Sequence, residues 1–179
     1  MKQETIMVQA AIDAQRMILR PLRTSDLGLV GMYAADRRVA EMTTTIPHPL
    51  PPGVIEALIV RAQAADRREF VWAMDATAFG GSEVLGLISL EQMDRDQSEV
   101  GYWVAPAFWN TGIASEAVRA LIEANPLGNK TIFASVFQDN PGSARVLTNA
   151  GFDYLGDAEA FCIARNATVA TWTYLNRLA

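Results

Sequence analysis

The stretch Glu99-Val-Gly-Tyr-Trp-Val-Ala-Pro-Ala-Phe-Trp-Asn-Thr-Gly-Ile-Ala-Ser-Glu-Ala117 carries the strongest local signal in this chain of 179 residues. Its first six residues are predicted to form a strand that Pro106 ends, and a helix is predicted from near Gly112 to about Ala124. The first turn of a helix has unpaired backbone N–H groups and the positive end of the helix dipole. The stretch therefore predicts an anion-binding turn that needs no basic side chain.

Hydrophobic periodicity predicts the remaining elements. Strands are expected over 17–20, 70–74, 83–90, 99–104, 131–137, 153–156 and 168–175, and helices over about 24–40, 54–68, 112–124 and 143–150. The strands 70–74, 83–90 and 99–104 follow one another across short turns, which predicts an antiparallel meander. The proline-rich segment 43–53 is expected to be a functional loop. We expect a single domain over residues 16–179 after an N-terminal extension, 1–15, that is partly helical.

Composition excludes several functional classes. Half of the residues are hydrophobic, a fifth are charged and the formal net charge is −5, which indicates a globular protein without a nucleic-acid partner. No apolar run approaches the roughly 20 residues that span a bilayer, and the N-terminus lacks a signal-peptide core, so we expect a cytoplasmic protein with no membrane partner. The single Cys162 and single His48 exclude a Cys- or His-based metal site. We expect Cys162 to be a buried, inert thiol. We expect His48 to be an incidental loop residue; the alternative is that it faces the acceptor pocket.

Four segments in order resemble the signatures of one family. Ala105–Ala117 is similar to the acetyl-CoA motif of GNAT acetyltransferases, in the branch related to the ribosomal-protein N-terminal (alanine) acetyltransferases. The other matching segments are Leu19-Arg20-Pro21, Glu99-Val-Gly-Tyr102, and Asn140–Arg145 followed by Ala150-Gly-Phe152. The resemblance covers roughly residues 16–178. It implies an α+β fold with a GNAT-like mixed, mostly antiparallel twisted sheet of about six or seven strands, flanked by helices on both faces.

The resemblance also implies a function. It indicates an N-acetyltransferase that moves the acetyl group from acetyl-CoA directly to a primary amine of a small molecule or of a protein N-terminus, with no metal; a homodimer is left open. In the family, the pantetheine arm pairs like an extra strand with the strand that carries residues 102–104. The cofactor-binding residues implied are Tyr102, Trp103, Val104, Trp109, Asn110, Thr111, Gly112, Ile113, Ala114, Ser115, Asn140 and Arg145.

Two residues are candidates for the catalytic groups. By resemblance, Ser143 lies near the cofactor sulfur as a proton donor; the alternative is that it caps the next helix, and both roles are compatible. Glu99 occupies the position of a frequent family Glu and is therefore preferred over Glu91 as the base. The alternative for both is a solvated strand carboxylate, and the alternative for Arg145 at a cofactor phosphate is an exposed helix residue.

The chain departs from the family pattern in the phosphate turn. Trp109 stands where many members have Gln or Arg, although Trp is common in this branch; Asn110 replaces a customary Gly, and Thr111 a customary Lys or Arg. The pyrophosphate would then depend on backbone N–H groups and the Thr111 hydroxyl, without a local cation. These departures leave open a non-catalytic acyl-CoA-binding or regulatory module. A nucleotide-binding domain is disfavoured, because neither Gly-Lys-Ser/Thr nor Gly-x-Gly-x-x-Gly follows a strand.

Overall fold

The structure is a computed structural model that describes residues 8–178. Within these residues one sheet has the strand order β1-β2-β3-β4-β5-β6-β8-β7. Its strands are β1 (Ile12–Asp13), β2 (Ile18–Pro21), β3 (Glu69–Asp75), β4 (Gly86–Gln92), β5 (Gln97–Val104), β6 (Thr131–Phe137), β7 (Asp153–Cys162) and β8 (Ala167–Arg177). The helices are α1 (Leu27–Ala34), α2 (Arg37–Ala40), α3 (Val54–Gln63), α4 (Ile113–Ala124) and α5 (Pro141–Asn149), and the 3₁₀ turns are η1 (Thr24–Asp26), η2 (Thr77–Phe79) and η3 (Pro106–Phe108). The α+β class and the meander β3-β4-β5 are confirmed.

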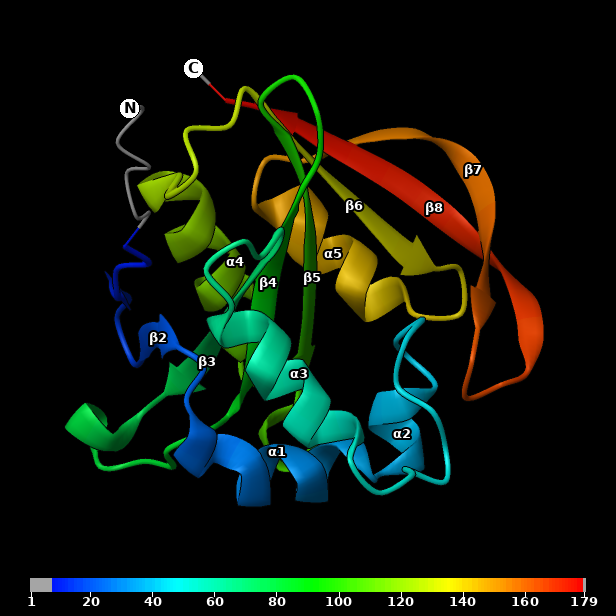
Figure 1. Cartoon of the computed structure of the whole chain (residues 1–179). Helices are drawn as coiled ribbons and strands as arrows, with labels where there is room; N and C mark the ends of the chain where they lie inside the picture. The colour runs from blue at the N-terminus through cyan, green and yellow to red at the C-terminus, as the bar shows by residue number, and fades with distance from the viewer. Residues whose placement is uncertain (1–7, 179) are drawn as a thin grey trace.

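The two central strands β5 and β6 separate along the sheet. β5 pairs with β4 from Ser98 to Val104, but with β6 only at 97–99, in parallel with 131–133. Beyond Glu99 the two strands diverge (Figure 1). The side of β5 that faces β6 is thus without a strand partner over residues 100–104, so its backbone groups are available to an extended ligand.

Helices pack on both faces of the meander, as expected. Alternate side chains along a strand point to opposite faces, so each strand contributes to two cores. One core joins Trp72, Ile88 and Val100 to Val118 and Leu121 of α4 and Leu147 of α5. The other joins Val71, Ala73 and Leu87 to Val30 of α1 and to Ile55 and Ile59 of α3. The two layers fix the meander, and therefore β5, as a rigid wall of the site.

The helix expected over 24–40 is divided in the structure, which corrects that boundary. Residues 24–26 form the turn η1, and α1 and α2 are separate helices. Asp36 lies between them in an extended conformation (ψ 125°), and its carboxylate accepts a hydrogen bond from the backbone N–H of Arg38 at 2.9 Å. This side-chain bond replaces a helical one, so Asp36 ends the first helix and caps the second.

Other boundaries also differ, by one to six residues, and the strand expected over 83–90 lies at Gly86–Gln92. The helix expected over 54–68 ends at Gln63, and the last two strands extend to Cys162 and Arg177. In the extension, residues 12–13 form strand β1, where a partial helix was expected. This strand brings the sheet in the described residues to eight strands, whereas six or seven were expected. The part of that expectation that concerns residues 1–7 lies outside the described residues. In the described part of the chain, no helix has the length and apolar character needed to cross a membrane.

Candidate active site

A cleft of about 530 Å³ lies where β5 and β6 separate. We call it the splay cleft; its walls are residues 100–104 of β5, 135–137 of β6, the turn 108–112 and the first turns of α4 and α5. Both helices begin at this cleft, so their unpaired N–H groups and the positive ends of their dipoles are directed toward it. The cleft is thus suited to an elongated ligand that ends in an anion.

The phosphate turn explains one departure from the family pattern. Asn110 has φ 60° and Gly112 has φ 78°, both in the left-handed region that favours glycine. Asn adopts this region more readily than most other residues with a side chain, so Asn110 can replace the customary Gly with the same backbone path. The Thr111 hydroxyl donates to the carbonyl of Phe108 at 2.5 Å, which directs its proton into the turn.

Arginines from other parts of the chain lie at this turn, which corrects the expectation that no cation is nearby. Arg38 and Arg145 line the splay cleft, and the Arg38 guanidinium carbon is 5.9 Å from the Trp109 ring centroid. Arg16 lies against the turn: its Nη2 would be 3.4 Å from a Cβ built on Gly112. Arg16 also forms an ion pair of 2.7 Å with Glu116 of α4. Arg16 and Arg38 gave no local signal because both precede the motif by more than 60 residues.

A hydrogen bond joins the two sides of the splay cleft. The hydroxyl oxygens of Tyr102 and Ser143 are 2.7 Å apart. Asn140 caps α5, because its Oδ1 accepts the backbone N–H of Ser143 at 3.3 Å; the alternative that Ser143 is the cap is therefore wrong. Burial raises the pKa of Tyr102 to about 12, although the hydrogen bond with Ser143 acts in the opposite direction. The pair therefore holds exchangeable protons at neutral pH.

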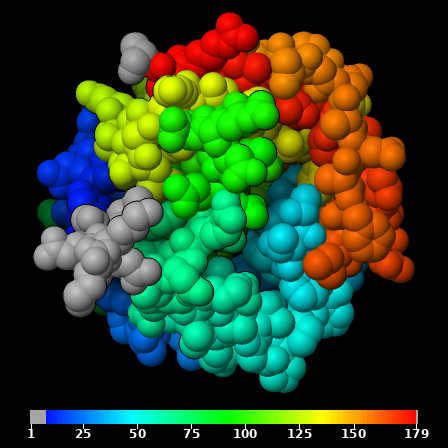
Figure 2. Space-filling model, turned by 45° about the horizontal axis from the view of Figure 1, so that its top comes forward, coloured from blue at the N-terminus to red at the C-terminus, as the bar shows by residue number. Residues whose placement is uncertain are grey.

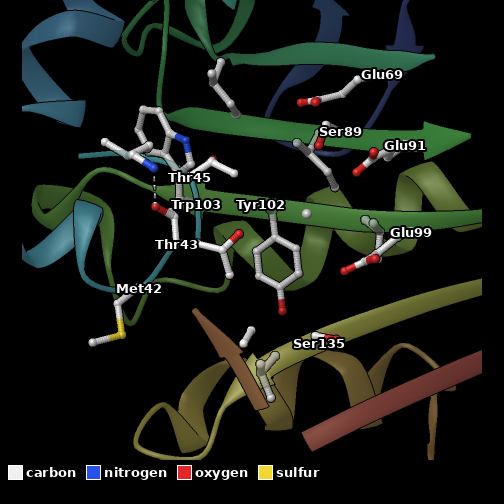
Figure 3. Close-up of a pocket in the computed structure, with 18 of the residues that line it drawn as sticks. Met42, Thr43, Thr45, Glu69, Ser89, Glu91, Glu99, Tyr102, Trp103 and Ser135 are labelled. Carbon is white, nitrogen blue, oxygen red and sulfur yellow. Dashed lines mark hydrogen bonds between the residues drawn. The ribbon is translucent and has the colours of Figure 1, made fainter. Parts of the chain in front are cut away.

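A second cavity, of about 260 Å³, lies beside the first. We call it the glutamate cavity, because Glu69, Glu91 and Glu99 line it (Figure 3). It shares the segment 100–103 of β5 and 135–137 of β6 with the splay cleft. The space-filling view shows a hollow between the cyan loop after α2, the green β4–β5 region and the orange β7 (Figure 2). The two cavities thus meet at the point where β5 leaves β6.

The loop 43–46 forms one side of the glutamate cavity, and the β7–β8 hairpin holds that loop in place. The backbone N–H of Ile163 donates to the carbonyl of Thr44 at 3.2 Å. The thiol of Cys162 donates to the carbonyl of Thr43 at 3.1 Å. Arg165 donates to the carbonyl of Glu41 at 2.8 Å. Cys162 is fully buried, as expected, and helps to position the loop.

The three glutamates lie side by side on neighbouring strands. Glu69 pairs with Glu91, and Glu91 with Glu99, in the registers of β3, β4 and β5. All three residues are exposed to solvent at the cavity wall. Partial burial of the carboxyl group, followed by the charge of Glu91, raises the pKa of Glu99. The same two causes raise the pKa of Glu69, with Arg61 acting against them. Among residues 8–178, no group of three or more His, Cys, Asp or Glu side chains is arranged to hold a metal ion.

The structure brings most of the predicted site residues together. Those that line the splay cleft are Tyr102, Trp103, Val104, Trp109, Asn110, Gly112, Ala114, Ser115, Asn140, Ser143 and Arg145. Thr111 and Ile113 are not among the lining residues, and the Ile113 side chain is buried in the core. Glu91 and Glu99 line the glutamate cavity, and Glu69 is the residue there that sequence reasoning missed. His48, in the described loop, lines neither cavity.

Comparisons with known proteins agree with this geometry. Residues 16–153 match the family described as acetyltransferase (GNAT) domain. The YoaA protein of Bacillus subtilis (strain 168), named as an uncharacterised N-acetyltransferase, is 36% identical over 74 residues, which span 40% of this chain and 41% of that protein. This chain belongs to the GNAT acetyltransferase family, as the sequence predicted.

Solved structures of the same fold include enzymes with different acceptors. Spermidine N-acetyltransferase from Vibrio cholerae, in complex with CoA and spermine, is 16% identical with a TM-score of 0.76, over 90% of this chain and 95% of that chain. Ribosomal-protein-S5-alanine acetyltransferase from Vibrio fischeri is 19% identical with a TM-score of 0.74, over 94% of this chain and 97% of that chain. At these identities the likeness confirms the fold, and it leaves the acceptor to be argued from the site.

Proposed function

We propose that this protein transfers the acetyl group of acetyl-CoA directly to a primary amine. One observation carries the proposal: the splay cleft and the glutamate cavity meet at residues 100–103 of β5. The first cavity has the features that a thioester with a long phosphorylated arm requires, and the second has carboxylates suited to an amine. A nucleophile and an acyl donor bound in adjoining cavities react with the entropic advantage of proximity.

The residues of the splay cleft fit the cofactor. Its phosphates would bind at the N-terminus of α4, where the backbone at 112–115 offers N–H groups. Arg38, which is paired with Asp36 at 2.8 Å, and Arg145 line the same cleft and add positive charge to it. Its arm would lie along the unpaired side of β5, as an extended peptide adds to a sheet edge. Bound there, acetyl-CoA supplies an activated acetyl group, and Asn140 lies beside its path.

The side chains at the junction supply the proton transfers. Attack forms the new N–C bond and breaks the C–S bond, so the amine must lose a proton and the departing sulfur must gain one. Glu99 accepts the amine proton, directly or through water, and its raised pKa makes it a stronger base than an ordinary glutamate. The Tyr102–Ser143 pair supplies the other proton, with Ser143 as the donor and Tyr102 as its hydrogen-bond partner.

Free thiol release in the presence of acetyl-CoA and a panel of small amines and peptides tests this function. We expect release only when an amine is present, together with the mass of the acetylated amine. Binding of acetyl-CoA by calorimetry without thiol release from any acceptor would instead favour a non-catalytic acyl-CoA-binding module. Absence of binding at millimolar acetyl-CoA would contradict the cofactor assignment itself.

A further inference from the structure

We propose that the acceptor is a small amine that carries a second positive charge, an inference that rests on the proposed function. Glu69 and Glu91 bind this second charge. The site itself is defined by the glutamate cavity and its junction with the splay cleft. The three glutamates determine which amine the cavity takes.

The strand registers place the carboxylates in a row that leads away from the transfer point. Glu99 is on β5, the strand shared by both cavities, and Glu91 and Glu69 follow on β4 and β3. Figure 3 shows the three side chains together on one side of the cavity. Neighbouring strands are about 5 Å apart, so the second charge of the acceptor would lie ~5 to ~10 Å from the reacting amine.

The row has no ion-pair partner in the described chain, although the positive charge of Arg61 is near enough to Glu69 to act on its pKa. Within residues 8–178, none of the three carboxylates takes part in an ion pair. Like charges on directly opposed strand residues destabilise a sheet. A bound cation would remove this repulsion, so the arrangement favours a ligand with positive charge over a neutral or acidic one.

The rest of the cavity suits a short hydrocarbon chain. On the same face of the meander, Val71 and Leu87 line the cavity, and the loop residue Ile46 and Leu58 of α3 add to this apolar wall. Gly101 also lines the cavity and contributes no side chain to it. An alkyl linker between two ammonium groups would have an apolar wall beside it and carboxylates at its charged ends.

The small volume of the glutamate cavity and the loop beside it favour a small molecule over a protein N-terminus as the acceptor. At about 260 Å³ the cavity is at the small end of ligand sites. The loop 43–46 borders it and is held by two hydrogen bonds from the β7–β8 hairpin, while a third, from Arg165, holds Glu41 just before the loop. A peptide acceptor would have to fit its backbone past this fixed loop. An alkyl diamine has no peptide backbone to accommodate.

Steady-state kinetics with matched acceptors tests the inference. We compare 1,4-diaminobutane, butylamine and a short peptide with a free N-terminal alanine, using the parent protein, Glu69→Gln, Glu91→Gln and the control Glu123→Gln on the exposed side of α4. We expect kcat/KM for the diamine to exceed that for butylamine by about tenfold or more, since a charge-assisted contact is lost with the monoamine. Glu69→Gln should raise KM for the diamine about tenfold and leave butylamine within about twofold, while Glu123→Gln leaves both unchanged. Glu91→Gln should also raise KM for the diamine about tenfold, and because the charge of Glu91 helps to raise the pKa of Glu99, it should lower kcat for both amines as well.

Each other outcome has a defined meaning. Equal kcat/KM for butylamine and the diamine, equal losses for both acceptors in Glu69→Gln, or a preference for the peptide would overturn this inference and leave the proposed function intact. If no amine is acetylated, the proposed function fails, and the inference with it. Salt provides a check that needs no variant: ionic strength should raise KM for the diamine more steeply than for butylamine, because it screens the added charge.

Discussion

The hydroxyl oxygens of Tyr102 in β5 and Ser143 in α5 lie 2.7 Å apart, across the cleft that opens where β5 leaves β6. Asn140 caps α5 in place of Ser143, so the Ser143 hydroxyl is available for this contact. The bond fixes the two hydroxyl groups at the junction between the splay cleft and the glutamate cavity. This position is the reason why we propose the pair as the proton donor in acetyl transfer.

Removal of either hydroxyl should slow catalysis more than it weakens cofactor binding. We expect Ser143→Ala and Tyr102→Phe each to lower kcat by about 10²-fold, the lower end of the range for general acid catalysis, with little change in the Kd of acetyl-CoA. Because the two groups act as one pair, the double variant should lose much less than the product of the single losses. Unchanged kcat in Ser143→Ala would remove Ser143 from the mechanism.

The phosphate turn should depend on backbone conformation more than on the side chain of Asn110. Gly112→Ala puts a residue with a side chain at φ 78°, and its Cβ would lie 3.4 Å from Nη2 of Arg16. The left-handed conformation then costs ~1 kcal/mol or more, so we expect the Kd of acetyl-CoA to rise about tenfold. Asn110→Gly keeps the left-handed conformation and should leave the Kd nearly unchanged. Calorimetric titration measures both, and a Gly112→Ala protein with parental affinity would contradict the assignment of this turn.

The charge of Glu99 should cost stability at neutral pH. Burial and the charge of Glu91 raise its pKa in the folded protein, so the folded state holds the proton more tightly and stability falls as pH rises through that pKa. Glu99→Gln should therefore be more stable than the parent at pH 7, by a few tenths to about 1 kcal/mol. The difference should disappear below the ordinary glutamate pKa of about 4.3, where both states are protonated.

Thermal unfolding at pH 7 and pH 4 measures this difference, with Glu123→Gln as a control for loss of one exposed charge. A melting temperature below that of the parent at pH 7 would show that Glu99 stabilises the fold. The same variant should lose acetyl transfer if Glu99 is the base, so stability and activity should change in opposite directions.

A buried ion cluster near the start of the domain should be essential for folding. Arg20 of β2 donates to both oxygens of Asp26 at 2.8 Å and to Asp75 at 2.6 Å, and the Asp26 side chain is fully buried. Asp26→Ala removes one partner of a buried pair and should cost about 3 kcal/mol in the free energy of unfolding. Chemical denaturation measures it. Asp36→Ala, which removes a half-buried carboxylate that caps α2, should cost about 1 kcal/mol. Equal losses would contradict the role given to burial.

The sequence was most informative where the signal is local. The phosphate turn depends on a strand end, Asn110, Gly112 and a helix start within a few residues, so both the turn and the family resemblance could be predicted. The strand over 131–137 was also correct at both ends, because its apolar residues stand between clear turns. Helix ends were less certain where a single side chain decides them, as Asp36 does between α1 and α2.

Features made by residues far apart in the chain were not predicted. Glu69 joins Glu91 and Glu99 only through the register of β3 and β4, and the connection 76–85 that sets this register contains η2 and has no standard hairpin length. Likewise, Arg16 and Arg38 reach the phosphate turn through tertiary packing. Ser143 and Tyr102 were both named as site residues, but their contact depends on how α5 packs against β5.

A crystal structure of the protein with bound CoA tests the central claim most directly. We expect the phosphates at the N-terminus of α4 beside Gly112, the arm along the unpaired side of β5, and the sulfur near the hydroxyl groups of Tyr102 and Ser143, facing the glutamate cavity. CoA bound elsewhere, or with its sulfur directed away from that cavity, would contradict the proposed site of acetyl transfer.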